Sequence, residues 1–355
     1  MIRATIAICA LCITLALSIS AENINEQKDG IFTGESNLIT VIFAGVEKVI
    51  INSANSISGN LYLGAGGKHC RISYQKKMKT ASKAEAATYA DLISVDVDNQ
   101  PTAATVWLRA PADAPWSGSN NSASLDVRID VPIGCQIEIN TAYFDIDAAG
   151  PFDEFVVSES LSKVTVSKVT RLTDINISNR PLVLKNISGD LKAKNKYEKI
   201  KLENIKTGDR TAIIRNENGE ISIDSFAGSM DIGTSYGLII GKKISLVGDR
   251  NRVKNVSAPI NIELDSLTSG RIRLNNQYSQ IVLHITGQVD ASFICKFGPD
   301  SFVKAEGFLF EPTLVYDERL EFDVGNAAAE ARLSIKGDGN IIINGPDSDH
   351  LAGGN

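Results

Sequence analysis

The chain has 355 residues, of which 43% are hydrophobic and 22% charged, so its composition is that of a folded protein rather than a disordered one. Its formal net charge is −6. This balance argues against a nucleic-acid-binding protein, because binding to phosphates needs a basic excess that displaces counterions.

The first residues have the pattern of a secretory signal peptide. A short basic start, Met-Ile-Arg, precedes an apolar run over residues 4–17 and small residues at 18–21. We therefore predict a signal peptide over residues 1–21 and an exported bacterial protein of the periplasm, the cell surface or the extracellular space. The apolar run is too short to cross a bilayer, and no later run reaches about 18 residues, so we expect no membrane span.

The next part of the chain is rich in strand patterns but has no repeat. The polar residues 22–36 predict a flexible leader, and residues 37–134 a β-rich region. Ser82-Lys-Ala-Glu85 is a capping box before an Ala-rich stretch, which predicts one helix over residues 82–92. Alternating apolar residues predict the strands of this region at 38–43, 48–51, 59–63, 70–74, 93–97, 105–108 and 125–131.

A repeated phrase dominates residues 135–291. NKYEKI, TSYGLI and NQYSQI belong to eight units whose starts are 18 or 21 residues apart. The units begin at Thr141, Glu159, Ile177, Asn195, Asn216, Thr234, Asn255 and Asn276. Their sixth residue is always aliphatic, namely Ile146, Val164, Leu182, Ile200, Ile221, Ile239, Ile260 and Ile281. The eighth residue is also apolar, except for Gly241.

The spacing of these residues predicts the fold. Residues two apart in a strand share a face, so each unit carries a strand with one apolar face, and its second half carries another. A unit of this length is too short for a βαβ or helical repeat, and it matches one flattened turn of chain with strands stacked about 4.8 Å apart. We therefore predict an all-β fold, a right-handed parallel β-helix (solenoid) of about eight coils.

A leucine-rich repeat is the strongest rival, since Leu161-x-x-Val164-x-Val166 resembles the start of its motif. It fails because Val169 and its counterparts stand where that motif needs Asn or Cys.

The C-terminal part predicts a cap. Phenylalanines crowd into residues 292–346, where a bulky segment is expected to close the open end of a solenoid. Residues 347–355 read as a disordered tail. Cys70, Cys135 and Cys295 are too few for a disulfide scaffold, and we expect buried thiols that act as small hydrophobic side chains.

Two positions of the unit suggest roles at its corner. Asn or Thr opens six of the eight units, where Asn suits a turn and its side chain can hydrogen-bond along a stack. Tyr143, Tyr197, Tyr236 and Tyr278 take the third position of four units. The pattern favours packing at a corner, and a ligand-binding stripe is the alternative, since tyrosine has an apolar face and a polar tip.

These motifs carry a family resemblance. The Val-Pro-x-Gly sequence at 131–134, the units that follow and the closing Gly-Asp-Gly at 337–339 resemble the bacterial "putative adhesin" domain family, an exported β-helical group of unknown function. The likeness covers residues 35–345 and departs from the pattern at Glu198, Pro259 and Ser279. It implies the fold and no catalytic residues.

Candidates for catalysis are few. Asp145, Asp147, Asp153 and Glu154 are the best carboxylate group, but Asp145 and Asp147 flank the inward Ile146 and are expected to point to solvent. The three histidines are far apart in sequence, without the spacing of metal ligands. We therefore expect neither cofactor nor metal site and no enzyme. The prediction is a binding or structural protein that presents a rigid surface to a glycan or cell-envelope partner. Polysaccharide degradation and self-assembly into an envelope scaffold are the alternatives.

Overall fold

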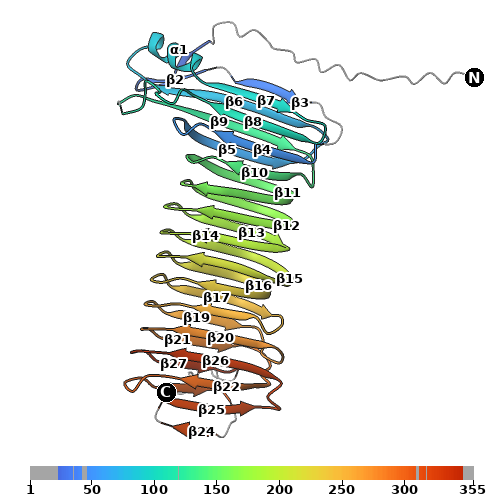
Figure 1. The fold of residues 1–355 in the computed structure, drawn as a ribbon, viewed down its shortest axis with the longest axis vertical. Helices are drawn as coiled ribbons and strands as arrows, with labels where there is room; N and C mark the ends of the chain where they lie inside the picture. Colours follow the sequence, from blue (N-terminus) through green and yellow to red (C-terminus); the bar gives the residue numbers. More distant parts are fainter. Residues whose placement is uncertain are drawn as a thin grey trace, which may run out of the picture.

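The computed structural model describes residues 23–34, 36–41, 46–118, 120–308, 312–316 and 318–346. Over these residues the protein is all-β apart from one helix, as the sequence predicts. Figure 1 shows an elongated stack of strands, with the N-terminal elements at one end and the C-terminal elements at the other.

One continuous parallel ladder, called here the first ladder, contains the sixth residue of every unit. These residues lie in register from unit to unit, from Ile146 against Val164 to Ile260 against Ile281. All eight are at most 2% exposed, so their predicted stacking is confirmed. The ladder comprises β5 (Ser58–Ala65), the first halves of β11 (Phe144–Ser160), β12 (Val164–Ile177), β15 (Ile200–Asn216) and β16 (Ile221–Gly233), and the strands β13 (Leu182–Ser188), β17 (Ile239–Leu246), β19 (Ile260–Leu264), β21 (Ile281–Ile285) and β27 (Ile341–Asn344).

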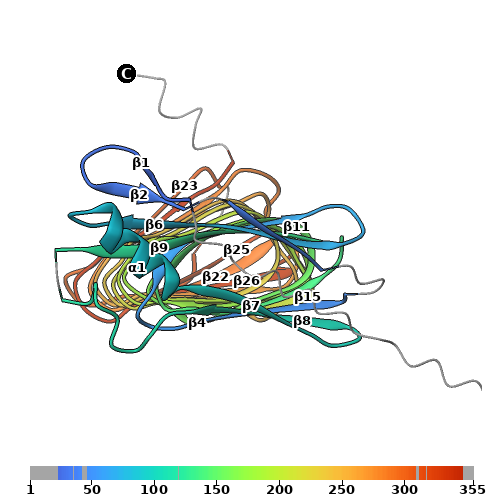
Figure 2. The ribbon, with the colours of Figure 1, turned by 90° about the horizontal axis from the view of Figure 1, so that it is seen from above.

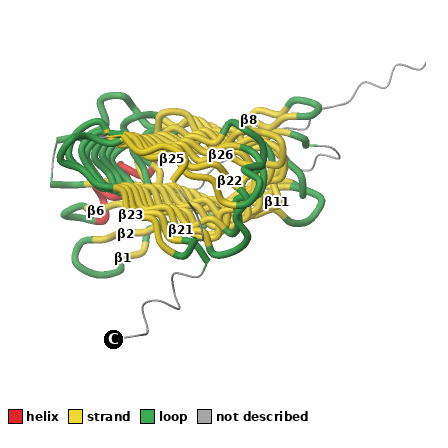
Figure 3. Tube along the Cα trace, turned by 90° about the horizontal axis from the view of Figure 1, so that it is seen from below, coloured by secondary structure: helices red, strands yellow, loops and turns green. Residues whose placement is uncertain are grey.

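A second parallel ladder lies opposite the first, and Figure 3 shows the two layers of strands end-on. Its inward residues, such as Ile175, Ile214 and Val253, are buried against the first layer. It comprises β4 (Lys48–Ser53), β10 (Gln136–Asn140), the second halves of β11, β12, β15 and β16, and the strands β14 (Asp190–Asn195), β18 (Asn251–Lys254), β20 (Arg271–Asn276), β26 (Ala329–Ile335) and β22 (Ala291–Lys296). Each strand of a ladder is called a rung below.

The N-terminal region extends both ladders, although its sequence shows no repeat. In space, β4 lies between β10 and β8 (Ala103–Arg109), and β5 lies between β11 and β9 (Ser122–Val131), all in parallel. The reason is an insertion: β6 (Cys70–Lys79), the helix and β7 (Ser94–Asn99) separate β5 from β8 along the chain and hide the period.

Antiparallel strands complete this end of the stack, which Figure 2 shows from above. β7 pairs with β8, and β6 pairs with β9, β3 (Asn37–Val41) and β2 (Ile31–Thr33). The expectation of a flexible leader over residues 22–36 is wrong in this part, because β1 (Asn25–Glu26) and β2 form a hairpin. Ile24 and Phe32 are at most 3% exposed, and the free edge of β6 supplies the hydrogen bonds that local sequence does not reveal. The predicted signal peptide and tail lie outside the described residues.

The single helix, α1 (Lys83–Asp91), begins as predicted. The Ser82 hydroxyl accepts a hydrogen bond from Glu85 N at 3.2 Å, as in a capping box. A Glu85 carboxylate oxygen accepts one from Ala81 N at 3.3 Å, one residue before the N-cap. Ala86, Tyr89 and Ala90 are buried, so this helix covers apolar surface at the N-terminal end.

The C-terminal end is also assembled out of chain order. β26 lies between β20 and β22, and β27 lies between β21 and β23 (Val303–Glu306), so the last two strands are enclosed by earlier ones. β25 (Arg319–Val324) and β24 (Pro312–Tyr316) then pair antiparallel beyond β22. Phe293 stacks on Phe322 at 4.7 Å between ring centroids, and Phe308 packs beside both, in the region where the sequence predicts an aromatic cap.

All three cysteines of the described residues are free and buried, as expected from their number and surroundings. Burial raises the pKa of the Cys295 thiol to about 12 and that of Cys70 to about 11, so both thiols are protonated at neutral pH.

Candidate functional site

One corner of the stack is formed where the second ladder turns into the first. The residue that opens each turn is buried and polar in six units: Thr141, Asn195, Asn216, Thr234, Asn255 and Asn276 are at most 6% exposed. Asn255 illustrates their role. Its Nδ2 donates to the Gly237 carbonyl of the preceding unit at 2.8 Å, and its Oδ1 accepts from Val256 N at 2.8 Å. These amides therefore bond along the stack to backbone carbonyls of neighbouring turns, and also to carbonyls of their own turn.

The tyrosines of the third position lie on the outside of this corner. Tyr143, Tyr197, Tyr236 and Tyr278 are 46%, 54%, 64% and 58% exposed, so about half of each side chain is open to solvent. Backbone hydrogen bonds join successive turns, for example from Ser235 N to Glu217 O at 3.1 Å and from Ser257 N to Ser235 O at 3.0 Å. These bonds place the turns of neighbouring units against one another.

Three of the four tyrosines recur with a regular period. Asn218 stands between Tyr197 and Tyr236, and Ser257 stands between Tyr236 and Tyr278. The tyrosines therefore occupy every second turn, which corresponds to roughly 10 Å at about 4.8 Å a rung. We call Tyr197, Tyr236 and Tyr278 the tyrosine row; Tyr143 lies three turns before it.

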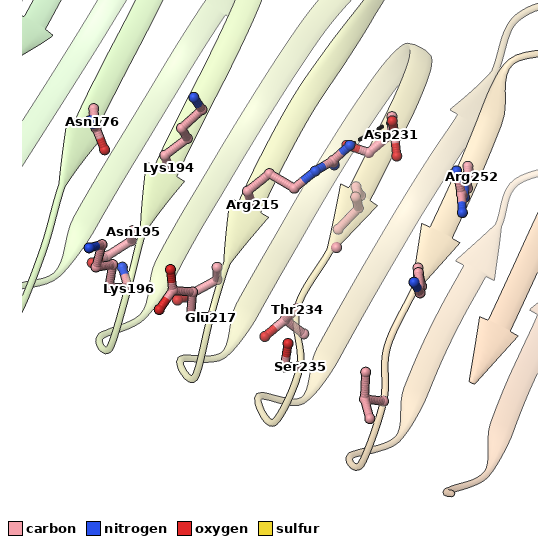
Figure 4. A pocket seen from close by; sticks show the side chains of 15 residues that line it. Asn176, Lys194, Asn195, Lys196, Arg215, Glu217, Asp231, Thr234, Ser235 and Arg252 are labelled. Carbon is pink, nitrogen blue, oxygen red and sulfur yellow. Dashed lines mark hydrogen bonds and ion pairs between the residues drawn. The ribbon is translucent and has the colours of Figure 1, made fainter. Parts of the chain in front are cut away.

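A groove of about 400 Å³ runs beside the tyrosine row. Figure 4 shows that its side chains come from the ends of successive strands and the turns that follow. Its outward residues lie in register on the second ladder: Asn176, Lys194, Arg215, Gly233 and Lys254. Lys196 and Ser235 also line it and directly precede Tyr197 and Tyr236, so the groove extends into the turns that carry these two tyrosines.

Gly233 opens the middle of this groove. A Cβ there would lie 3.6 Å from Arg215 Cδ, because the Arg215 side chain extends across the glycine. Arg215 thereby reaches Asp231, with 2.6 Å from Nη2 to the Asp231 carboxylate and 2.6 Å from Nη1 to the Asp231 carbonyl. Two hydrogen bonds to one residue hold the guanidinium in a fixed position.

The other cations of the groove are not neutralised in this way. Its lining has five basic residues against Glu217 and Asp231, in a chain of net charge −6. Lys194, Lys196, Arg252 and Lys254 are exposed, and none makes an ion pair among the residues that the structure describes. The groove therefore carries local positive charge.

A second depression of about 480 Å³ continues the groove towards the N-terminal end. Asn176 lines both, and the remaining side chains are largely neutral, such as Asn140 and Ser158 from the preceding rungs. Its one carboxylate, Asp174, lies 3.5 Å from Lys192 Nζ. The corner thus offers a long polar channel with a basic half.

The carboxylates considered for catalysis have other partners. Asp145 and Asp147 are exposed, as predicted, and Asp145 accepts a hydrogen bond from Lys163 N of the next unit at 2.9 Å. Asp153 and Glu154 both pair with Arg171, with 2.8 Å between Arg171 Nε and Asp153 Oδ2. No group of three or more His, Cys, Asp or Glu side chains in the described part of the chain is placed to hold a metal ion. No helix in that part is long and apolar enough to cross a membrane.

Sequence reasoning found the tyrosines and missed the groove. Its basic residues come from different units, so no local cluster marks them in the chain. The sequence does mark the groove at one recurring position, the residue just before each unit start. These residues are Asn140, Ser158, Asn176, Lys194, Arg215, Gly233, Lys254 and Asn275.

The chain matches no family model and no curated protein. Solved structures do resemble it. A "putative adhesin" from Parabacteroides merdae is 11% identical, with 86% of this chain and 95% of that chain covered and a TM-score of 0.32. A "putative adhesin" from Bacteroides fragilis is 9% identical, with 87% and 97% covered and a TM-score of 0.24. A "putative cell adhesion protein" from Clostridium sporogenes is 10% identical, with 88% and 99% covered and a TM-score of 0.20.

Proposed function

We propose that this is an exported, non-enzymatic binding protein that holds an extended glycan or cell-envelope polymer along its corner. In this proposal the two ladders are the faces of a right-handed parallel β-helix, the hand that crossover connections between parallel strands normally take. Export is supported by the signal pattern at the N-terminus.

The observation that carries the proposal is the alignment of the tyrosine row with the long polar groove. Tyrosine rings stack on the apolar faces of sugar rings and offer a hydroxyl at the same time. Both features repeat along the stack axis, so they suit a linear polymer better than a compact ligand. Continuous hydrogen-bonded ladders keep the spacing constant, which limits the conformational entropy lost on binding.

Binding of the full chain to an array of linear polysaccharides tests this function. A Tyr197→Ala/Tyr236→Ala/Tyr278→Ala variant is expected to lose at least tenfold in affinity for any polysaccharide that binds. Tyr62→Ala is the matched control, because Tyr62 is 45% exposed on β5, outside the corner. Equal binding by the triple variant and the control would remove the tyrosine row from the function.

The same samples distinguish binding from catalysis. The polysaccharide that binds is expected to keep its length during incubation with the protein. Shortening of the polymer that disappears in Asp145→Ala or Asp147→Ala would instead establish the degrading enzyme.

A further inference from the structure

We infer that the polymer is an acidic polysaccharide built from disaccharide units, with about one carboxylate or sulfate per unit. This inference rests on the proposed function and names the chemical class of its ligand. It follows from two independent features of the corner, the unpaired cations and the period of the tyrosine row.

The unpaired cations indicate an anionic ligand. Some cations elsewhere in the stack meet a carboxylate of the same or the next turn, as Lys185 meets Glu203 at 2.9 Å and Lys199 meets Glu220 at 2.7 Å. Others, such as Lys206, stand singly rather than in a group. Lys194, Lys196, Arg252 and Lys254 form a local excess that the described residues leave unbalanced. Their charges remain available to an anion in the groove.

The spacing between successive tyrosines of the row indicates the length of the repeating unit of the ligand. Two rungs span roughly 10 Å, which is close to the length of one disaccharide in an extended β-linked polysaccharide. Each half of the basic groove adjoins one tyrosine: Lys196 precedes Tyr197, and Lys254 O accepts a hydrogen bond from Thr234 N in the turn that carries Tyr236. Sugar rings on successive tyrosines would therefore place one acidic group per disaccharide beside lysines.

Charge density argues against nucleic acid in the same groove. Duplex DNA carries one negative charge per about 1.7 Å of its axis, hence about six over this two-rung spacing. The groove offers fewer unpaired cations over that distance, and Glu217 and Asp231 line it as well. Carboxylates repel phosphates but accept hydrogen bonds from sugar hydroxyls, so the mixed lining suits a sparsely charged glycan.

Calorimetric titration of the full chain with matched polymers tests the inference. The probes are hyaluronan, unsulfated chondroitin and heparosan, which carry one carboxylate per disaccharide, each beside its carboxyl-reduced neutral form, and a duplex DNA of twenty base pairs. At least one acidic polysaccharide is expected to bind at least tenfold more tightly than its neutral form. That difference should shrink as salt screens the charges.

Variants then locate the charge recognition. Lys194→Gln/Lys254→Gln is expected to lower the affinity for the acidic form about tenfold and that for the neutral form by much less, because glutamine keeps a hydrogen-bond donor. Lys185→Gln, whose lysine is already paired with Glu203, is the control and should alter neither.

The outcomes separate this inference from the proposed function. Equal affinity for acidic and neutral forms would overturn the acidic ligand and keep glycan binding. No binding by any of the six polysaccharides would overturn both, and so would tighter binding of the DNA than of every polysaccharide. A charge preference that persists in Lys194→Gln/Lys254→Gln would overturn the assignment to this groove.

Discussion

The face of the stack around Glu203, called here the paired face, and the basic groove are both built on parallel ladders. They differ in how their charged side chains are arranged. On the paired face, Lys185 and Lys201 both contact Glu203, and these two lysines hold its pKa below the ordinary range. In the groove, Lys194 and Lys254 stand in an equally regular column with no carboxylate in contact among the described residues. In a stacked fold, residues at the same position of successive turns become neighbours. Their charges therefore decide whether that strip of the surface forms ion pairs or keeps a net charge.

Gly237→Ala is expected to have the largest effect, because it disrupts the corner that supports the groove. An added Cβ would lie 1.8 Å from the Gly219 carbonyl oxygen, and this backbone contact cannot relax easily. We expect a loss of about 3 kcal/mol in the free energy of unfolding, measured by chemical denaturation. Gly66→Ala, with open space around it, is the control and should change stability by less than about 0.5 kcal/mol.

Asn255→Ala should come next. It leaves the Gly237 carbonyl and Val256 N–H of a buried turn without their partner, which costs about 2 kcal/mol. Thermal and chemical unfolding measure this loss. Asn218 lies exposed in a neighbouring turn, and Asn218→Ala should cost less than about 0.5 kcal/mol. A similar loss in both variants would show that burial of the Asn255 amide is not what matters.

Gly233→Val is expected to weaken ligand binding in the groove while leaving the stability of the fold nearly unchanged. The new side chain would occupy the path of Arg215, whose flexible chain can move aside, so stability should change by less than about 1 kcal/mol. The affinity for the acidic polysaccharide should fall about tenfold in the same titration. Unchanged affinity in a folded variant would mean that the ligand does not enter the middle of the groove.

Asn176→Glu should convert part of the groove into a paired face. Position 176 lies in register beside Lys194, so a carboxylate there can form the kind of pair seen at Glu203. We expect a gain of at most about 0.5 kcal/mol in stability, with a fewfold loss of affinity for the acidic form. Asn176→Gln has the side-chain length of glutamate without its charge. An equal loss of affinity in that variant would contradict an electrostatic cause.

Glu203→Gln should have the smallest effect, and it should depend on pH. The hydrogen bonds from Lys201 and Lys185 lower the pKa of Glu203, so its stabilisation is fully present above the unfolded-state pKa of about 4.3 and is lost as pH falls through the lower folded value. At neutral pH the variant should lose no more than about 0.5 kcal/mol, because the pair is exposed. The difference from the wild type should vanish in acid, and a difference that persists there would contradict the ion-pair cause.

Sequence patterns predicted the elements that depend on local alternation. The buried column from Ile146 to Ile281 and the helix after Ser82 were both accessible, because period and capping are local properties of the chain. Gly241 shows where this reasoning stops. It breaks the apolar column because Ile262 Cδ1 fills the space, 2.9 Å from where its Cβ would be.

Other features depend on contacts between distant segments. The bend between the ladders uses left-handed backbone at Lys168, Asn186, Asn204, Ser225 and Lys243, and no residue type common to these positions announces it. Among these five side chains, the described residues show one side-chain bond along the stack, with 2.6 Å between Asn204 Nδ2 and Asn186 Oδ1. The insertion of β4 between β8 and β10, and of β26 between β20 and β22, likewise requires pairing across intervening chain.

The sequence alone determined which side chains face inward and how often the chain turns, since the alternation of strands and the length of a unit are properties of consecutive residues. Tertiary structure alone decided that Lys194, Arg215 and Lys254 line one groove at the corner whose turns carry exposed tyrosines. Residues a unit or more apart in the chain meet across rungs only about 4.8 Å apart, and their combined charge exists only after the ladders form.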